Sequence, residues 1–207
     1  MRKAATEIES SKANPSSKIV PLQLDVTDDE SIANSRALVE KEIKSLDVLI
    51  NNAGVGGLKQ DLRTRMTNTF TTNVLGAALV ADAFRPLLLK SSNPYSLYVS
   101  SGAGSISRAT GASPTFEGEE AYRISKAAMN MLAVWENVEH GKKGLKVFAV
   151  CPGFVVSNLR GKDEDSRTGW GKASSADTSG ELMLAIIRGD RDADVGKFVH
   201  KDGVYPW

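Results

Sequence analysis

The chain has 207 residues, a length that suits one domain, and 25% of them are charged, with a net charge of +1. This balance is that of an ordinary globular protein and favours neither nucleic acid nor a membrane surface as a partner. No apolar run is long enough to span a bilayer. The single cysteine, Cys151, excludes an internal disulfide and fits a reducing, cytoplasmic location. The two histidines, His140 and His200, lie far apart in sequence, so we expect no metal site.

Strand-like and helix-like segments alternate along the chain. In order, the patterns predict a strand at 18–26, a helix at 28–46, a strand at 46–54, a helix at 63–90, a strand at 96–101, a helix at 119–140, a strand at 145–153, a helix at 180–188 and a closing strand within 196–207. Such alternation indicates an α/β fold in which helices cover both faces of a parallel sheet. We therefore expect a single doubly wound, Rossmann-like domain over residues 1–207.

Three short motifs follow predicted strands: NNAG at 51–54, SSGAG at 100–104 and CPGF at 151–154. Folds of this kind bind their ligands at the carboxyl ends of the strands. We therefore expect the three motifs to lie together on one rim of the sheet, although they are far apart in sequence.

The stretch YRISK places Tyr122 and Lys126 four residues apart, and therefore on one face of the predicted helix. A tyrosine with its ordinary pKa of about 10 transfers protons poorly at neutral pH. A lysine ammonium about 4 Å away would stabilise the phenolate by roughly 4 kcal/mol, which would bring the pKa toward about 7. The pair alone is weak evidence, because a half-buried tyrosine beside a solvated lysine shows the same spacing.

Six motifs, taken in order, resemble those of the short-chain dehydrogenase/reductase family, and the resemblance extends over nearly the whole chain. They are DVTD with Asp25, NNAG at 51–54, TTNVLG with Asn73, YVSSGAG with Ser101, YRISK with Tyr122 and Lys126, and PGFVVS at 152–157. Each motif alone is weak, whereas six ordered matches are specific. The tail at 196–207 resembles that of the carbonyl-reductase-like members of the family.

The resemblance implies an NAD(P)-dependent oxidoreductase acting on a carbonyl/alcohol pair, with NADPH-dependent reduction of a small ketone or aldehyde favoured over the use of NADH. Tyr122 would exchange the proton, Lys126 would lower its pKa and bind the nicotinamide ribose, Ser101 would hold the substrate oxygen, and Asn73 would support a proton relay. The implied cofactor-binding set is Asp25, Asn51, Ala53, Gly54, Tyr122, Lys126, Pro152, Gly153, Val155 and Ser157. Ser157 stands where the family usually has threonine, so a hydroxyl is retained.

Several assignments stay open at this level. Ser100 is an alternative to Ser101, and Asn73 is alternatively a helix-interior asparagine bonded to a backbone carbonyl. Cys151 is expected to be a small buried hydrophobe rather than a reactive thiol. The resemblance also implies a homodimer through the long helix and the tyrosine-bearing helix, in which Met129, Leu132 and Trp135 fit either that interface or the core. The apolar residues that recur at helical spacing on the second helix are Ile124, Ala128, Met131, Trp135 and Val138.

The family opens with a strand, a glycine-rich turn and a helix that hold the cofactor pyrophosphate. In this sequence, GVGGLK from Gly54 has Lys59 at the third glycine of G-x-G-x-x-G, and GAGSIS from Gly102 has Ser107 there. We therefore expect an N-terminally truncated sheet that lacks one β-α-β unit. An alternative function follows from this expectation: a non-catalytic family member that has lost nucleotide binding and acts through protein interaction.

A second departure is the long interval between Ser101 and Tyr122, with the extra residues at 107–120. This segment would lie beside the substrate pocket. It is read as a surface loop, with the hypothesis that Phe116 forms a pocket wall.

Overall fold

The computed structural model describes residues 16–56, 60–111 and 118–207. Its strands form one sheet in chain order: β1 (Val48–Asn51), β2 (Tyr95–Val99), β3 (Lys146–Val150), β4 (Phe198–His200) and β5 (Gly203–Tyr205). Strands β1 to β4 are parallel, and β5 returns antiparallel to β4. The α-helices are α2 (Asp29–Glu42), α3 (Leu62–Thr69), α4 (Ala77–Leu88), α5 (Ile106–Ala109), α6 (Glu120–His140), α7 (Glu164–Thr168) and α8 (Asp177–Ile187). The shorter or irregular helices are η1 (Phe70–Gly76), η2 (Gly102–Gly104), η3 (Gly141–Lys143) and η4 (Asp192–Asp194).

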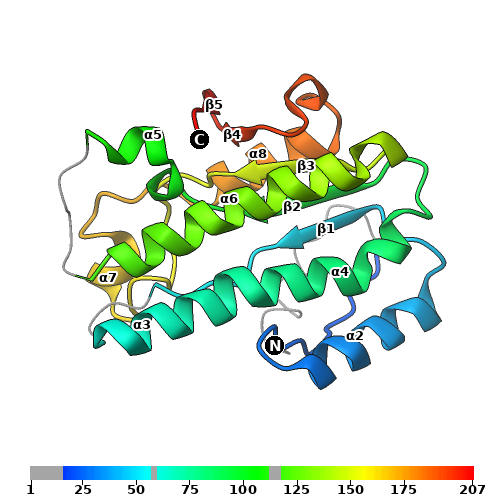
Figure 1. The fold of residues 1–207 in the computed structure, drawn as a ribbon, viewed down its shortest axis with the longest axis horizontal. Helices are drawn as coiled ribbons and strands as arrows, with labels where there is room; N and C mark the ends of the chain where they lie inside the picture. Colours follow the sequence, from blue (N-terminus) through cyan, green and yellow to red (C-terminus); the bar gives the residue numbers. More distant parts are fainter. Residues whose placement is uncertain (1–15, 57–59, 112–117) are drawn as a thin grey trace.

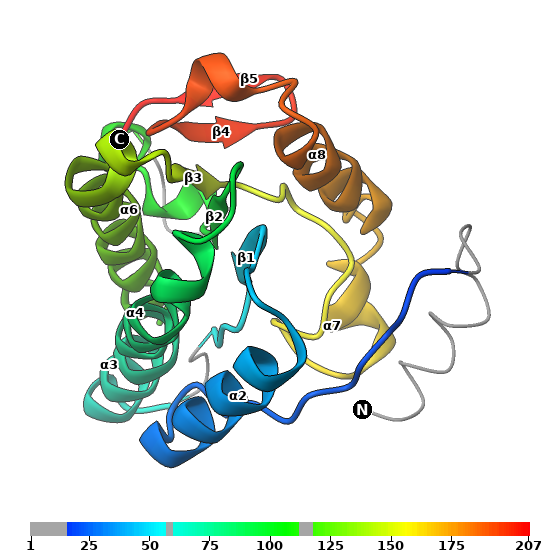
Figure 2. The same ribbon diagram turned by 90° about the vertical axis from the view of Figure 1, so that its right-hand side faces the viewer.

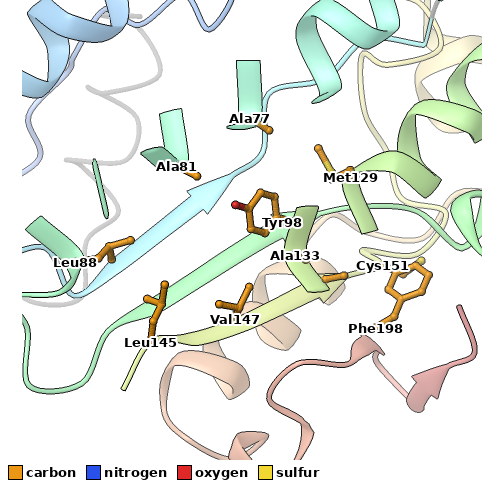
Figure 3. Packing of buried hydrophobic residues seen from close by; sticks show 11 residues of the cluster. Ala77, Ala81, Leu88, Tyr98, Met129, Ala133, Leu145, Val147, Cys151 and Phe198 are labelled. Carbon is orange, nitrogen blue, oxygen red and sulfur yellow. The ribbon is translucent and has the colours of Figure 1, made fainter. Parts of the chain in front are cut away.

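Helices cover both faces of the sheet, as the sequence predicts for a Rossmann-like α/β fold (Figure 1). Figure 2 shows α3, α4 and α6 along one face and α8 on the opposite face. Alternate residues of β2 and β3 supply the two cores. Tyr98 and Val147 belong to the cluster beneath α4 and α6 (Figure 3), whereas Leu97 and Phe148 belong to the cluster beneath α8.

The helix predicted at 63–90 is confirmed as one continuous run of α3, η1 and α4. Asp61 caps its start, since its side chain accepts a hydrogen bond from the backbone N–H of Thr64 at 3.1 Å. The middle turn, η1, is a π-helix that contains Asn73. Single π-helical turns are rare and occur frequently at functional sites.

The strand predicted at 18–26 is wrong. This segment is extended, and its side chains alternate between exposed and half-buried from residue 21 to residue 26, but it pairs with no strand in the described part of the chain. Leu24 and Val26 instead pack against the cluster that α2 and α4 share. An extended segment becomes a strand only through hydrogen bonds to a neighbouring strand, and β1 is paired with β2 alone.

The apolar residues that recur at helical spacing on α6 lie on one face of the helix, as predicted, but this face points away from the core. Met131 and Trp135 are 63% and 57% exposed, and Ile124 and Val138 are also exposed. The buried face of α6 is formed by other positions, among them Met129.

The three motifs that follow strands lie on one edge of the sheet, as predicted. Asn51, the last residue of β1, is in register with Tyr98, and Val99 is in register with Val150. Because the three strands are parallel, the segments that leave their carboxyl ends emerge side by side. This edge is where the candidate site lies.

Candidate active site

A cleft of about 1290 Å³ lies at the carboxyl edge of β1, β2 and β3. Its lining comes from the loops after these strands, from the first turns of α6 and from the polar segment that contains α7. Of the catalytic residues expected from the sequence, Ser101, Tyr122 and Lys126 line it. Residues 112–117, which include Phe116, lie outside the described part of the chain.

Tyr122 lies in the first turn of α6, and the Ser101 side chain is close enough to lower the pKa of its phenol. Ser101 begins η2, where its side chain accepts a hydrogen bond from the backbone N–H of Ala103 at 3.2 Å. Both hydroxyls are thus directed by the ends of secondary-structure elements. They form the part of the cleft at which a polar oxygen can be held between two donors.

The structure distinguishes the two serines. Ser100 is buried, and its hydroxyl donates to Asn130 Oδ1 at 2.5 Å and to the Lys126 carbonyl at 3.3 Å. These bonds tie the end of β2 to α6. Ser101 lines the cleft beside Tyr122 and makes neither of these bonds to α6 in the described structure, and its substrate-binding role stays a prediction.

Lys126 lies one turn after Tyr122 and is 3% exposed. Its ammonium donates to the Val99 carbonyl at 2.7 Å and approaches Met129 Sδ at 3.6 Å. Burial lowers the pKa of Lys126 to about 8. The ammonium lies 5.7 Å from the centroid of the Tyr122 ring.

The expected lowering of the Tyr122 pKa toward 7 is wrong for this structure. Burial raises the pKa of Tyr122 above its ordinary value, and this effect outweighs the hydrogen bond from Ser101, which acts to lower it. Lys126 does not offset the effect of burial on Tyr122, because its ammonium is directed to the Val99 carbonyl at the end of β2.

Asn73 is fully buried in η1 and clamps the loop after β1. Its Oδ1 accepts from the Val55 N–H at 2.8 Å, and its Nδ2 donates to the Val55 carbonyl at 3.0 Å and to Ser125 Oγ at 2.9 Å. The alternative of an asparagine bonded to a backbone carbonyl is therefore observed. The proton-relay role stays a prediction.

The residues expected to hold a nicotinamide cofactor fall into two groups. Those that line the cleft, besides Tyr122 and Lys126, are Gly54, Pro152, Gly153, Val155 and Ser157. Asp25, Asn51 and Ala53 do not line it. Asp25 accepts hydrogen bonds from Thr27 N–H and Oγ1 at 2.9 and 2.7 Å, which lower its pKa, and Thr27 lines a separate hollow of about 380 Å³. Asn51 is buried, and its Nδ2 finds no acceptor in the described part of the chain.

Gly54 tests whether the cleft fits the nicotinamide end of such a cofactor. A methyl group on Gly54 would lie 3.3 Å from Asn73 Oδ1, which is a tight contact, and 3.6 Å from Lys126 Nζ, so it would occupy space beside the lysine that glycine leaves open. Together with the hydroxyl of Ser157, this arrangement fits the nicotinamide and its ribose. No strand precedes β1 within 16–56, and the fit therefore does not extend to the pyrophosphate, which the family's first strand and turn would hold.

The segment after β3 contributes residues that the sequence patterns did not mark. Arg160 lies over the Phe154 ring, with 4.3 Å between its guanidinium carbon and the ring centroid. Trp170 adopts a left-handed backbone conformation, with φ of 55°, directly after Gly169, which packs on Phe154. Arg160, Phe154 and Trp170 all line the cleft. The pair of glycines around Trp170 was the one signal of unusual backbone in the sequence.

Cys151 behaves as predicted from the sequence. It is 7% exposed and part of the core beneath α4 and α6, and its sulfur accepts from the Gly102 N–H at 3.1 Å. Within the residues described, no cluster of three or more metal-ligating side chains occurs, and no helix has the length and apolar character needed to cross a bilayer.

Comparisons with known proteins agree with this geometry. A family model described as short chain dehydrogenase matches residues 1–168. The short-chain dehydrogenase/reductase tropE of Talaromyces stipitatus is 33% identical over 202 residues, covering 90% of this chain and 76% of that protein. The C-signal protein of Myxococcus xanthus is 34% identical over 167 residues, covering 78% of this chain and 93% of that protein. The crystal structure of NADPH-bound carbonyl reductase from chicken fatty liver matches with a TM-score of 0.80 at 29% identity, covering 100% of this chain and 81% of that one.

Proposed function

Because this chain belongs to the short-chain dehydrogenase/reductase family of oxidoreductases, we propose that it reduces a ketone or aldehyde to an alcohol with NADPH. The observation that supports this most directly is the approach of the Ser101 and Tyr122 hydroxyls in the cleft, with Lys126 buried beside them. Two hydroxyls held together at the carboxyl edge of a parallel sheet can bind one carbonyl oxygen.

In the proposed reaction, Ser101 donates a hydrogen bond to the carbonyl oxygen of the substrate, and Tyr122 gives that oxygen its proton as negative charge develops on it. The reduced nicotinamide, when bound, supplies the hydride, which no side chain can supply. Gly54, Lys126, Val155 and Ser157 would hold the nicotinamide and its ribose. Lys126 keeps its positive charge at neutral pH, since its pKa is about 8.

The raised pKa of Tyr122 keeps its phenol protonated at neutral pH, which is the state that reduction requires. A tyrosine with a raised pKa is protonated at neutral pH and is ready to act as an acid. To accept a proton from an alcohol, the same residue would first have to lose its own. The reduction rate should therefore hold through neutral pH, fall as Lys126 loses its charge above its pKa of about 8, and fall further as pH rises through the pKa of Tyr122.

The choice of NADPH is supported by the similarity to the carbonyl reductase from chicken fatty liver, whose structure contains NADPH. A cytoplasmic location is supported by the single cysteine, which fits a reducing compartment. The exposed apolar face of α6, with Met131 and Trp135, supports a homodimer through that helix.

Tyr122→Phe tests the proposed reaction. We expect NADPH-dependent reduction of a panel of ketones and aldehydes to fall by about 100-fold or more, because the variant keeps the ring but loses the acidic proton. Circular dichroism should show an unchanged fold. Tyr95→Phe is the matched control, since the Tyr95 hydroxyl bonds to Asp192 and does not line the cleft.

A Tyr122→Phe variant that keeps more than about a tenth of the wild-type kcat/KM would contradict the assigned role. Calorimetric titration of the wild-type chain with NADPH distinguishes a wrong role for Tyr122 from a chain that does not bind the cofactor. If NADPH does not bind at micromolar concentration, the chain is instead a family member without nucleotide binding.

A further inference from the structure

Arg160 is held in the cleft by the segment that follows β3. Its Nε donates to the Ser166 carbonyl at 3.0 Å, and its Nη2 donates to the carbonyls of Val155 and Arg167 at 3.0 and 2.8 Å. The guanidinium also lies over the Phe154 ring. The planar head group is therefore fixed in position by three carbonyls and one aromatic face.

The charge of Arg160 has no counter-charge in the described structure. No carboxylate there forms an ion pair with it, and its three hydrogen-bond acceptors are neutral carbonyl groups. An arginine has five N–H donors, of which two, both on Nη1, remain without an acceptor among the described residues. Partial burial lowers the pKa of Arg160, which is the effect of removing an uncompensated cation from water.

Arg160 lines the same cleft as Ser101 and Tyr122. Its positive charge acts to lower the pKa of Tyr122, and the tyrosine in turn acts on Arg160. The cation therefore shares the cleft with the hydroxyl that would meet the substrate carbonyl.

We propose that Arg160 determines substrate specificity by binding a carboxylate or similar oxyanion on the carbonyl compound that is reduced at Tyr122. This inference rests on the proposed function for the identity of the reaction. A guanidinium with two unused donors in a partly water-excluded cleft matches an oxyanion in both charge and geometry. A neutral ketone of the same shape would leave those donors unpaired.

A matched pair of ligands tests the proposal: 4-acetylbenzoate, which carries a carboxylate, and its methyl ester, which does not. Their affinities for the wild-type chain are measured by ligand-observed NMR, without and with saturating NADPH. We expect the carboxylate to bind about tenfold to 100-fold more tightly than the ester, the range for a charge-assisted hydrogen bond. Equal affinities for the two ligands, or no binding of the carboxylate, would overturn the proposal without any mutation.

Two substitutions then separate anion binding from a purely structural role. Arg160→Gln should remove the preference for the carboxylate, and Arg160→Lys should restore part of it because the charge returns. Arg167→Gln is the control, since that side chain pairs with Glu164 and does not line the cleft. If Arg160→Gln weakens both ligands equally, Arg160 only fastens the loop, and the proposal is wrong.

The arm with NADPH distinguishes a substrate anion from a cofactor phosphate. A preference for the carboxylate that persists under saturating NADPH supports a substrate site. Loss of that preference on adding NADPH, together with weaker NADPH binding by Arg160→Gln, would assign Arg160 to the cofactor and overturn the proposal. Failure of the chain to bind NADPH would count against the proposed function, while the carboxylate preference measured without NADPH would still decide the role of Arg160.

Discussion

Gly104 sets the spacing between the loop that carries Ser101 and the helix that carries Lys126. A methyl group at Gly104 would lie 2.6 Å from the carbonyl carbon of Lys126 and 2.8 Å from its Cβ. These atoms belong to a packed helix and cannot swing aside. The Gly104 carbonyl also accepts a hydrogen bond from Asn130, the residue that holds Ser100. The absence of a side chain at Gly104 therefore maintains the approach of Ser101 to Tyr122.

We expect Gly104→Ala to lower the free energy of unfolding by about 1–3 kcal/mol, because overpacking forces the backbone to shift. The displacement of Ser101 from Tyr122 should also lower kcat/KM for carbonyl reduction by about tenfold to 100-fold. Gly111→Ala is the control, since a methyl group there meets no atom of the described residues within 4 Å. Urea unfolding and steady-state kinetics measure both effects. Identical unfolding midpoints for the two variants would show that α6 yields to the added methyl group.

Sequence reasoning found Ser101, Tyr122 and Lys126 because each stands in a short motif at a predicted strand or helix end. It did not single out Arg160, because the charges of the polar loop at 157–180, although this loop resembles the family's substrate lid, fit a solvated face better than a ligand clamp. Only the folded loop brings that side chain beside Tyr122. The direction of the Tyr122 pKa shift was also beyond the sequence, because a spacing of four residues does not say where the lysine ammonium points.

At the scale of elements, the errors arise where a segment depends on its neighbours. The alternation of apolar residues at 18–26 was real, but a strand also needs a paired edge, which no sequence pattern reports. In α2, which is amphipathic only in part, Ile32 is buried whereas Leu38 is exposed. The periodicity of α6 correctly predicts that its apolar residues share one face. Whether that face contacts the core or solvent depends on how the helix packs against the sheet, which the periodicity does not report.

The exposed face of α6 gives the prediction at this scale. If α6 forms a subunit interface, the wild-type chain should sediment as a dimer of its 22.2 kDa protomer, and Trp135→Lys should convert it to the monomer. The reason is that a lysine buried there would leave a charge without a partner. Leu184→Lys, at an exposed apolar position on α8, should leave the dimer intact. A wild-type chain that sediments as a monomer across micromolar concentrations would contradict the proposed homodimer.

At the scale of the whole molecule, the fold class was predictable because nearly every strand is a short apolar run and nearly every helix is amphipathic. Complete burial of both faces of β2 follows from its place between β1 and β3, with helices on each side. The same burial that closes the core also encloses Lys126, whose charge the proposed reaction uses. The stability of the molecule is therefore linked to a residue of the proposed site.

This linkage makes the stability of the cofactor-free chain depend on pH in a way that Lys126→Met should remove. Lys126 has a pKa of about 8 in the folded chain and an ordinary value of 10.5 when unfolded. Between these values the unfolded chain binds a proton that the folded chain has released, so stability rises as pH increases from 8 to 10.5. Below pH 8 both states are protonated, and the cost of burying the charge is constant.

At about 1.4 kcal/mol per pH unit, the gain contributed by Lys126 is about 3 kcal/mol. The measurement is the free energy of unfolding by urea at several pH values, taken as the difference between the wild-type chain and Lys126→Met. The difference cancels groups common to both, including Tyr98 and Tyr122, whose raised pKa values oppose the gain above pH 10. The variant also loses the hydrogen bond that Lys126 donates to the Val99 carbonyl, which lowers its stability across the pH range. Lys90→Met, at an exposed site, is the control and should follow the wild-type pH profile. If the Lys126→Met profile runs parallel to that of the wild type, the Lys126 ammonium reaches water in the folded chain and the predicted linkage is wrong.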